Sequence, residues 1–210
     1  MLTRVHALPD LAERLTSETH GPHWNSVHAV FESWVDGRPP KAALRRHLTD
    51  LAPAESAELV SRSRETTTHF AWCLRDRPDE PFTFWLHEYK PQRDWRAGYA
   101  DSVHNHRYHF CTVILSGGYR HERFSATIDP VTGLVDAATM TRGADYALGT
   151  SGYLLASEFH RIPTALDGTM TFLVKSRPVA PWSLSFDPGT GLGHRHVPVE
   201  CRLPELTKRI

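Results

Sequence analysis

Apolar residues recur every three or four positions in the first part of the chain. The segments 8–15 and 27–34 show this spacing clearly, 42–51 carries a third apolar set, and 54–64 is rich in the helix formers Ala, Glu and Leu. Turn-forming Gly and Pro residues separate the second segment from the third. The pattern predicts a group of helices over residues 1–65.

From Phe70 onward the pattern changes to short runs of β-branched and aromatic residues divided by turn signals. We expect strands at 82–89, 107–115, 118–128, 134–140, 152–160, 169–175 and 182–186. Gly117-Gly118 and the Asp-Pro-Val-Thr-Gly run at 129–133 supply turns between neighbouring strands. Because no helical segments lie between these strands, the pattern predicts an antiparallel sandwich or barrel.

The length of 210 residues suits one compact domain with an added element. We therefore expect residues 1–65 to form a helical appendage on a barrel built from residues 66–210. The apolar stripe of the appendage is too short to close a core alone, so the two parts are expected to fold as one domain.

The charge balance narrows the classes of partner. Lys and Arg total 24, as do Asp and Glu, so no net field attracts nucleic acid or an anionic membrane. The N-terminus has no apolar run of signal-peptide length, and no run approaches the roughly 18 residues of a membrane span. These features predict a cytoplasmic protein that binds neither nucleic acid nor membrane.

Cys73, Cys111 and Cys201 are odd in number and show no Cys-x-x-Cys spacing. This arrangement argues against a disulfide framework and against a structural zinc site. We expect all three to be reduced thiols.

His104 and His106 are the first candidate metal ligands. In an extended chain, residues two apart project from the same face, so both imidazoles can reach one ion while Asn105 points away. Imidazole binds iron, zinc, copper and nickel alike, so the pair does not select the metal. The alternative is two solvated histidines in a loop.

A third ligand is expected from a distant strand, and His160, at the end of the predicted strand 152–160, is the best placed. Glu158 lies two residues earlier and shares its face, so a site with two histidines and one carboxylate is a second possibility. We expect His109, His194 and His196 to be solvated or packing residues.

These motifs resemble the cupin superfamily, and within it the thiol dioxygenases typified by cysteine dioxygenase. The resemblance runs from Phe82 to Pro178, with His104-Asn105-His106 and Ser116-Gly117-Gly118 as the first motif and His160-Arg161-Ile162 as the second. It implies a mainly β fold, a cupin-type antiparallel β-barrel (jelly roll). Most cupins carry a glutamate where Phe110 stands, and its loss is what cysteine dioxygenases show, with iron on three histidines.

The resemblance also suggests roles for other residues. Cys111 falls where animal cysteine dioxygenases place the cysteine of a Cys-Tyr cross-link, but 169–175 lacks the partner tyrosine and a nearby histidine. Cys111 lies an odd number of residues from His104 and His106, so it faces the opposite side of the strand unless a bulge intervenes. We therefore expect it to be a small buried hydrophobe. Arg75 or Arg77 is expected to clamp a substrate carboxylate, because guanidinium offers two parallel hydrogen bonds. Tyr108 lies two residues after His106, so we expect it to face the same side as the ligands and to line the pocket.

The resulting hypothesis is a mononuclear non-haem iron(II) oxygenase that uses dioxygen and acts on a small polar, carboxylate-bearing molecule. Its candidate catalytic residues are Arg75 and Tyr108. Another divalent transition metal is possible at the same ligands. The alternatives are a non-redox metal cupin, such as an isomerase or hydrolase, and a cupin that only binds a small ligand.

Overall fold

The computed structural model of the chain describes residues 7–18 and 23–209. Four helices precede the strands, as predicted: α1 (Ala7–Glu18), α2 (Trp24–Asp36), α3 (Pro40–Thr49) and α4 (Pro53–Arg62). Proline at the first position of α3 and of α4 fits there, because the missing N–H has no helical partner at that point. In the part of the chain described, no helix is long and apolar enough to cross a membrane.

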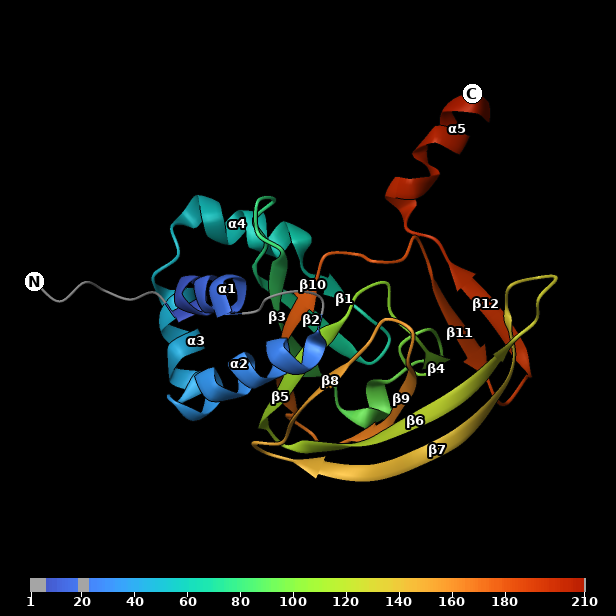
Figure 1. Cartoon of the computed structure of the whole chain (residues 1–210), viewed down its shortest axis with the longest axis horizontal. Helices are drawn as coiled ribbons and strands as arrows, with labels where there is room; N and C mark the ends of the chain where they lie inside the picture. The colour runs from blue at the N-terminus through green and yellow to red at the C-terminus, as the bar shows by residue number, and fades with distance from the viewer. Residues whose placement is uncertain (1–6, 19–22, 210) are drawn as a thin grey trace, which may run out of the picture.

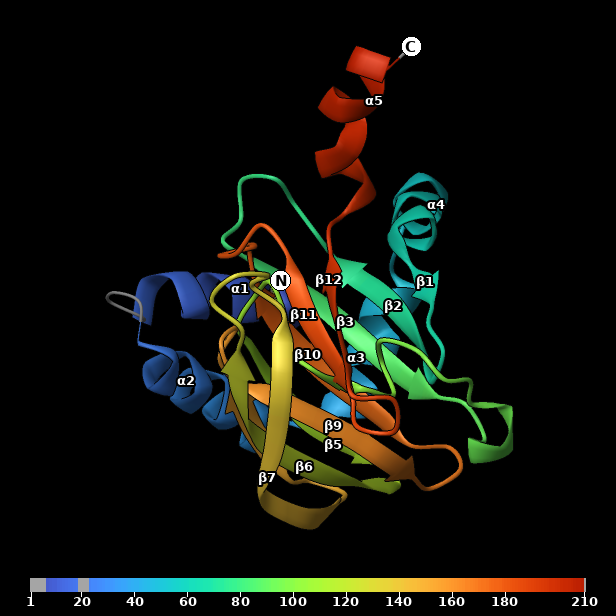
Figure 2. The same cartoon turned by 90° about the vertical axis from the view of Figure 1, so that its right-hand side faces the viewer.

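Twelve strands form two six-stranded antiparallel sheets. The first sheet runs in the order β1 (Arg64–Glu65), β2 (His69–Arg75), β3 (Phe82–Tyr89), β10 (Met170–Ser176), β5 (Phe110–Ser116) and β8 (Ser151–Leu154). The second runs in the order β12 (Leu192–His196), β11 (Ser183–Asp187), β4 (Val103–His104), β9 (Phe159–Ala165), β6 (Gly118–Ile128) and β7 (Val135–Ala147). Short 3-10 turns lie at Gln92–Asp94 and Val199–Arg202, and a last helix, α5 (Leu203–Arg209), projects from the body (Figures 1 and 2).

The order of the strands identifies the architecture. Strands β3 to β10 form the orders β3-β10-β5-β8 and β4-β9-β6-β7, so the chain crosses from one sheet to the other between successive strands, except at the β6–β7 hairpin within the second sheet. This is the connectivity of an eight-stranded jelly roll built from two Greek keys, the barrel type to which cupins belong. The predicted fold class, an antiparallel jelly roll with N-terminal helices, is confirmed.

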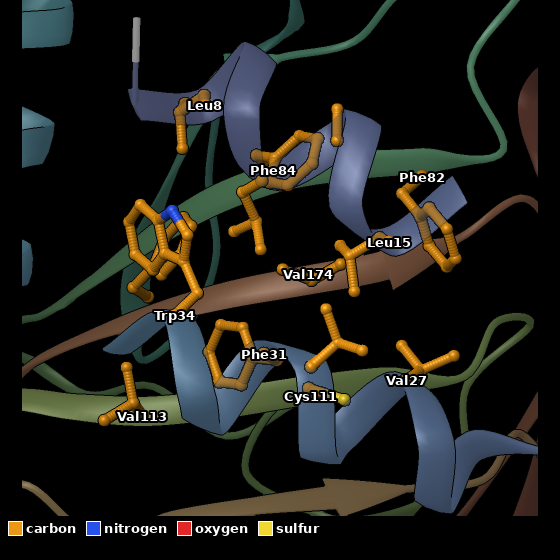
Figure 3. Packing of buried hydrophobic residues seen from close by; sticks show 14 of the residues in the cluster. Leu8, Leu15, Val27, Phe31, Trp34, Phe82, Phe84, Cys111, Val113 and Val174 are labelled. Atoms are coloured by element: carbon orange, nitrogen blue, oxygen red, sulfur yellow. The ribbon is translucent and has the colours of Figure 1, made fainter. Parts of the chain in front are cut away.

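The helices cover the outer face of the first sheet (Figure 1). Leu8, Leu15 and Phe31 from α1 and α2 pack in one cluster with Phe84 and Val174 from strands β3 and β10 (Figure 3). The helical segment and the barrel therefore share a hydrophobic core, and α4 packs separately against β2.

Cys111 belongs to the same outer cluster, 0% exposed and beside the helices (Figure 3). The predicted packing role of this thiol is confirmed. The opposite face of the first sheet points into the barrel, where Trp85, Phe110 and Leu173 pack together.

The predicted strand at 152–160 was wrong as one continuous element. The chain forms β8, turns at 155–158 and re-enters the second sheet as β9, so His160 is the second residue of a new strand. The Glu158 carboxylate accepts a hydrogen bond from the Leu155 amide at 2.7 Å, and the Glu158 amide donates to the Leu155 carbonyl at 3.0 Å. These bonds close a tight turn that the apolar pattern of 152–160 does not reveal.

The C-terminal segment also differs from expectation. Residues 192–196, where no strand was predicted, form β12 in register with β11.

Candidate metal centre

His104, His106 and His160 come together inside the barrel, as the sequence predicted. One nitrogen from each imidazole lies within 4.8 Å of those of the other two. His104 and His160 stand directly opposite each other on the paired strands β4 and β9. His106 follows the end of β4, and its Nε2 lies 2.8 Å from Nε2 of His160.

Asn105 explains why the two neighbouring histidines share a face. Its side-chain oxygen accepts a hydrogen bond from the Leu184 amide at 2.7 Å, and its own amide donates to the Leu184 carbonyl at 3.1 Å. Asn105 is therefore turned toward β11, which leaves His104 and His106 facing the interior.

The outer nitrogen of His104 fixes its tautomer. Nδ1 lies 2.8 Å from the Ser102 carbonyl oxygen, which can only accept, so Nδ1 carries the proton and donates it. Burial lowers the pKa of His104 to about 4, so the ring is neutral near pH 7. Its Nε2 therefore offers a lone pair to the interior.

His160 is held in a similar way by a residue that sequence reasoning missed. Its Nδ1 lies 2.9 Å from Nε2 of His121, which stands on β6. Burial lowers the pKa of His121 to about 4, so this is a hydrogen bond between neutral imidazoles. The sequence feature that could have revealed His121 is its position in the strand. Residues two apart in a strand face the same side, and Tyr119, His121 and Arg123 all line the same cavity.

The donor set fits a transition-metal ion. Burial holds the pKa of His106 and of His160 well below the usual value, so both rings are neutral. Two ring nitrogens 2.8 Å apart repel each other unless a proton or a cation lies between them. Neutral imidazoles with an outer partner are the usual form of metal-binding histidines.

The carboxylate alternative does not form in this structure. Glu158 pairs with Arg123 at 2.8 Å and closes the turn before β9, and it is not part of the histidine group. Phe110, where most cupins have glutamate, lies edge-on to His106 with ring centroids 5.2 Å apart.

Two cavities meet at the histidines. The inner cavity has a volume of about 130 Å³ and the outer one about 710 Å³. Both are lined by His104, His106 and Tyr108. Tyr108 stacks on His106 with ring centroids 5.2 Å apart, and burial raises its pKa. The structure therefore places Tyr108 in the pocket wall, as expected.

Arg75 is not brought to the histidines. Its Nε donates to Oε2 of Glu80 at 2.9 Å, and it lines a different cavity, beneath α4. A bulge in β2 sets Cys73 opposite Trp85 but Arg75 opposite Phe84. The extra residue reverses the parity, so Arg75 leaves the barrel interior that Cys73 faces.

Arg77 also lies away from the histidines. Its side chain is 55% exposed and sits 3.6 Å from Glu55 of α4. The expectation that Arg75 or Arg77 lies beside the metal was therefore wrong.

The other histidines have packing roles. Nδ1 of His109 accepts a hydrogen bond from the Ala156 amide at 2.9 Å, and its ring lies 5.3 Å from that of Trp24. His196 bonds to the Ser185 hydroxyl at 2.7 Å, and His194 is exposed on the same strand. None of the three joins the metal-binding group in the described part of the chain.

Lys175 is a further residue that sequence reasoning missed. It is 3% exposed, and its Nζ lies 3.3 Å from Nε2 of His87. It shares the inward face of β10 with Thr171 and Leu173, which line the inner cavity. The sequence feature that could have revealed Lys175 is a single charged residue in an apolar strand, at a position that faces the barrel interior.

No protein-family profile matches the chain, and no curated protein matches it. A structure of oxalate decarboxylase from Bacillus subtilis is 19% identical over 54% of this chain and 26% of that chain, with a TM-score of 0.36. A variant of that enzyme is 18% identical over 60% of this chain and 30% of that chain, with a TM-score of 0.40. This chain thus spans less than a third of the length of the enzyme it matches. Likenesses this distant say nothing about activity, and the jelly-roll fold follows from the strand order above.

Proposed function

We propose that the protein is a mononuclear non-haem iron(II) oxygenase of the cupin type, similar to cysteine dioxygenase, that acts on a small carboxylate-bearing molecule. The observation that carries the proposal is the group of three neutral imidazoles on the wall of a cavity. When bound, iron(II) on three neutral ligands would keep its full charge and about three open positions, for a substrate donor and dioxygen.

The residues of the chain prepare this chemistry in two ways. The Ser102 carbonyl and His121 hold two of the imidazoles in orientation through their outer nitrogens. Tyr108 and Phe110 enclose the space beside His106, which limits access of water to the reacting groups.

Metal analysis and dioxygen uptake test the proposal together. We expect about one iron per chain after reconstitution with iron(II), and dioxygen uptake with at least one member of a panel of thiols and small acids. His160→Ala should lose both metal and uptake. The exposed His194→Ala is the matched control and should retain both. Full metal content in His160→Ala would refute the site.

A second candidate is a metal cupin without redox chemistry. Cys111 favours it, because this thiol faces the helices and cannot form a Cys-Tyr cross-link beside the histidines. A protein that binds zinc, nickel or manganese in preference to iron, and takes up no dioxygen with any member of the panel, would support this candidate.

A further inference from the structure

Most of the charged residues that line the outer cavity beside the histidines are cations. Arg64, Arg107, Lys175 and Arg177 line it, and Asp76 is the one acidic residue among its described lining residues. Asp76 already pairs with Arg177 at 2.6 Å. Four cations stand against one acidic residue in this described lining, and an electropositive cleft of this kind concentrates small anions.

Lys175 differs from the arginines in its burial. It is 3% exposed, and its Nζ lies 4.5 Å from the ring centroid of Trp85 and 5.0 Å from that of Tyr108. Its hydrogen-bond partner is Nε2 of His87 at 3.3 Å, and no ion pair to a carboxylate is found for it among the described residues. Burial holds the pKa of this amine well below 10.5. Burying an ammonium without an anion is costly, and a bound anion would offset that cost.

Lys175 also lies close to the histidines. Tyr108 stacks on His106 at 5.2 Å and lies 5.0 Å from the ammonium, so Nζ is within about 10 Å of the His106 ring centroid. A molecule of a few heavy atoms spans such a distance. One of its ends can reach the imidazoles while the other contacts Lys175.

We propose that Lys175, with His87 beside it, binds the carboxylate of a small monoanionic substrate whose other end lies at the three histidines. The assignment rests on the proposed function for that second end. In this assignment the Lys175 ammonium takes the role that was expected of Arg75 or Arg77. The ammonium lies between the aromatic rings of Trp85 and Tyr108, and a carboxylate is small and flat enough to contact it there.

Acetate and its neutral analogue acetamide are the probes. Their dissociation constants are measured by saturation-transfer NMR on iron-loaded and on metal-free protein, for wild type, Lys175→Met and Lys90→Met. Lys90 is the matched control, because it is also a buried lysine but is paired with Glu65 and lines neither cavity at the histidines. We expect acetate to bind wild type and Lys90→Met equally, and Lys175→Met at least tenfold more weakly. Acetamide should bind none of them measurably.

A second measurement does not depend on how the variant folds. In wild-type protein, acetate should slow reductive methylation of Lys175, followed by peptide mass spectrometry, and acetamide should not. Unchanged acetate affinity in folded Lys175→Met, or equal methylation with and without acetate, would overturn the assignment.

The two proposals fail separately. Acetate binding that depends on Lys175 in a protein that takes up neither iron nor dioxygen would leave the anion site standing and refute the oxygenase. If the protein binds iron and takes up dioxygen but Lys175→Met leaves the acetate affinity unchanged, the anion site alone is refuted.

Discussion

Individual hydrogen bonds decide which nitrogen of each histidine faces the interior. His104 donates its Nδ1 proton to a backbone carbonyl, whereas His160 depends on a side chain, His121. A backbone carbonyl cannot be removed by substitution, but a side chain can. The orientation of His160 is therefore the part of the site most open to mutation.

We expect His121→Ala to weaken divalent-metal binding about 10–100-fold, the usual cost of losing an outer partner of a metal-binding histidine. The three ligands remain, so binding should weaken without being abolished. Competition with a chromophoric chelator measures the affinity. His28→Gln is the control, since His28 bonds to Ser151 on the helix-facing side and is not part of the metal-binding group. Affinity within twofold of wild type in His121→Ala would contradict the expected role.

Protonation of the half-buried His69 should make the metal-free protein sensitive to acid. Burial lowers the pKa of His69 from 6.5 to about 3, so below pH 6.5 the unfolded chain binds a proton that the folded chain does not. This stability is present above pH 6.5 and is lost as the pH falls toward 3. At ~1.4 kcal/mol per pH unit, one such histidine costs about 2 kcal/mol between pH 6.5 and 5. Urea unfolding at pH 7.5 and 5 measures it, and the loss should be smaller in His69→Gln.

At the scale of strands and turns, short irregularities such as bulges determine which of the predicted residues lie at the site. Alternation along regular strands predicted that His104 and His106 share a face and that Cys111 faces away. The expectation that Arg75 lies at the pocket came from the family resemblance, and it failed because a bulge in β2 adds one residue and turns Arg75 away from the barrel interior. A bulge depends on the pairing with β3, which the sequence of β2 alone does not contain. His121 and Lys175 were missed because their partners come from distant strands.

The turn between β8 and β9 offers a test at the same scale. In Glu158→Gln the salt bridge to Arg123 is lost, and the hydrogen bond to the Leu155 amide is weakened. We expect a loss of about 1 kcal/mol in the free energy of unfolding and an unchanged metal content. Thermal unfolding and metal analysis measure the two effects. A fall in metal content equal to that of His160→Ala would restore Glu158 as a ligand.

In the whole molecule, the helices and the barrel depend on one shared core. Phe31 and Trp34 of α2 both pack on Phe172 of β10, with ring centroids 5.8 Å apart in each pair. Removal of the helices would expose this face of the first sheet to water.

We therefore expect residues 1–65, expressed alone, to show no cooperative thermal transition, because their apolar faces lack the sheet against which they pack. Residues 66–210 alone should aggregate or bind a hydrophobic dye. Circular dichroism melting and dye fluorescence test both fragments, with the full chain as control. A sharp, reversible transition in the 1–65 fragment would show an independent domain.

The pairing of β4 with β9 has a consequence for how the protein acquires its ion. His104 and His106 are neighbours in the chain, but His160 reaches them only across a contact between distant segments. Such non-local contacts form late and slowly in folding. A nascent chain therefore offers two imidazoles at most, and the complete binding set exists only once the two sheets have closed. A divalent metal ion present during refolding should stabilise the finished barrel by mass action while leaving the rate of its formation nearly unchanged.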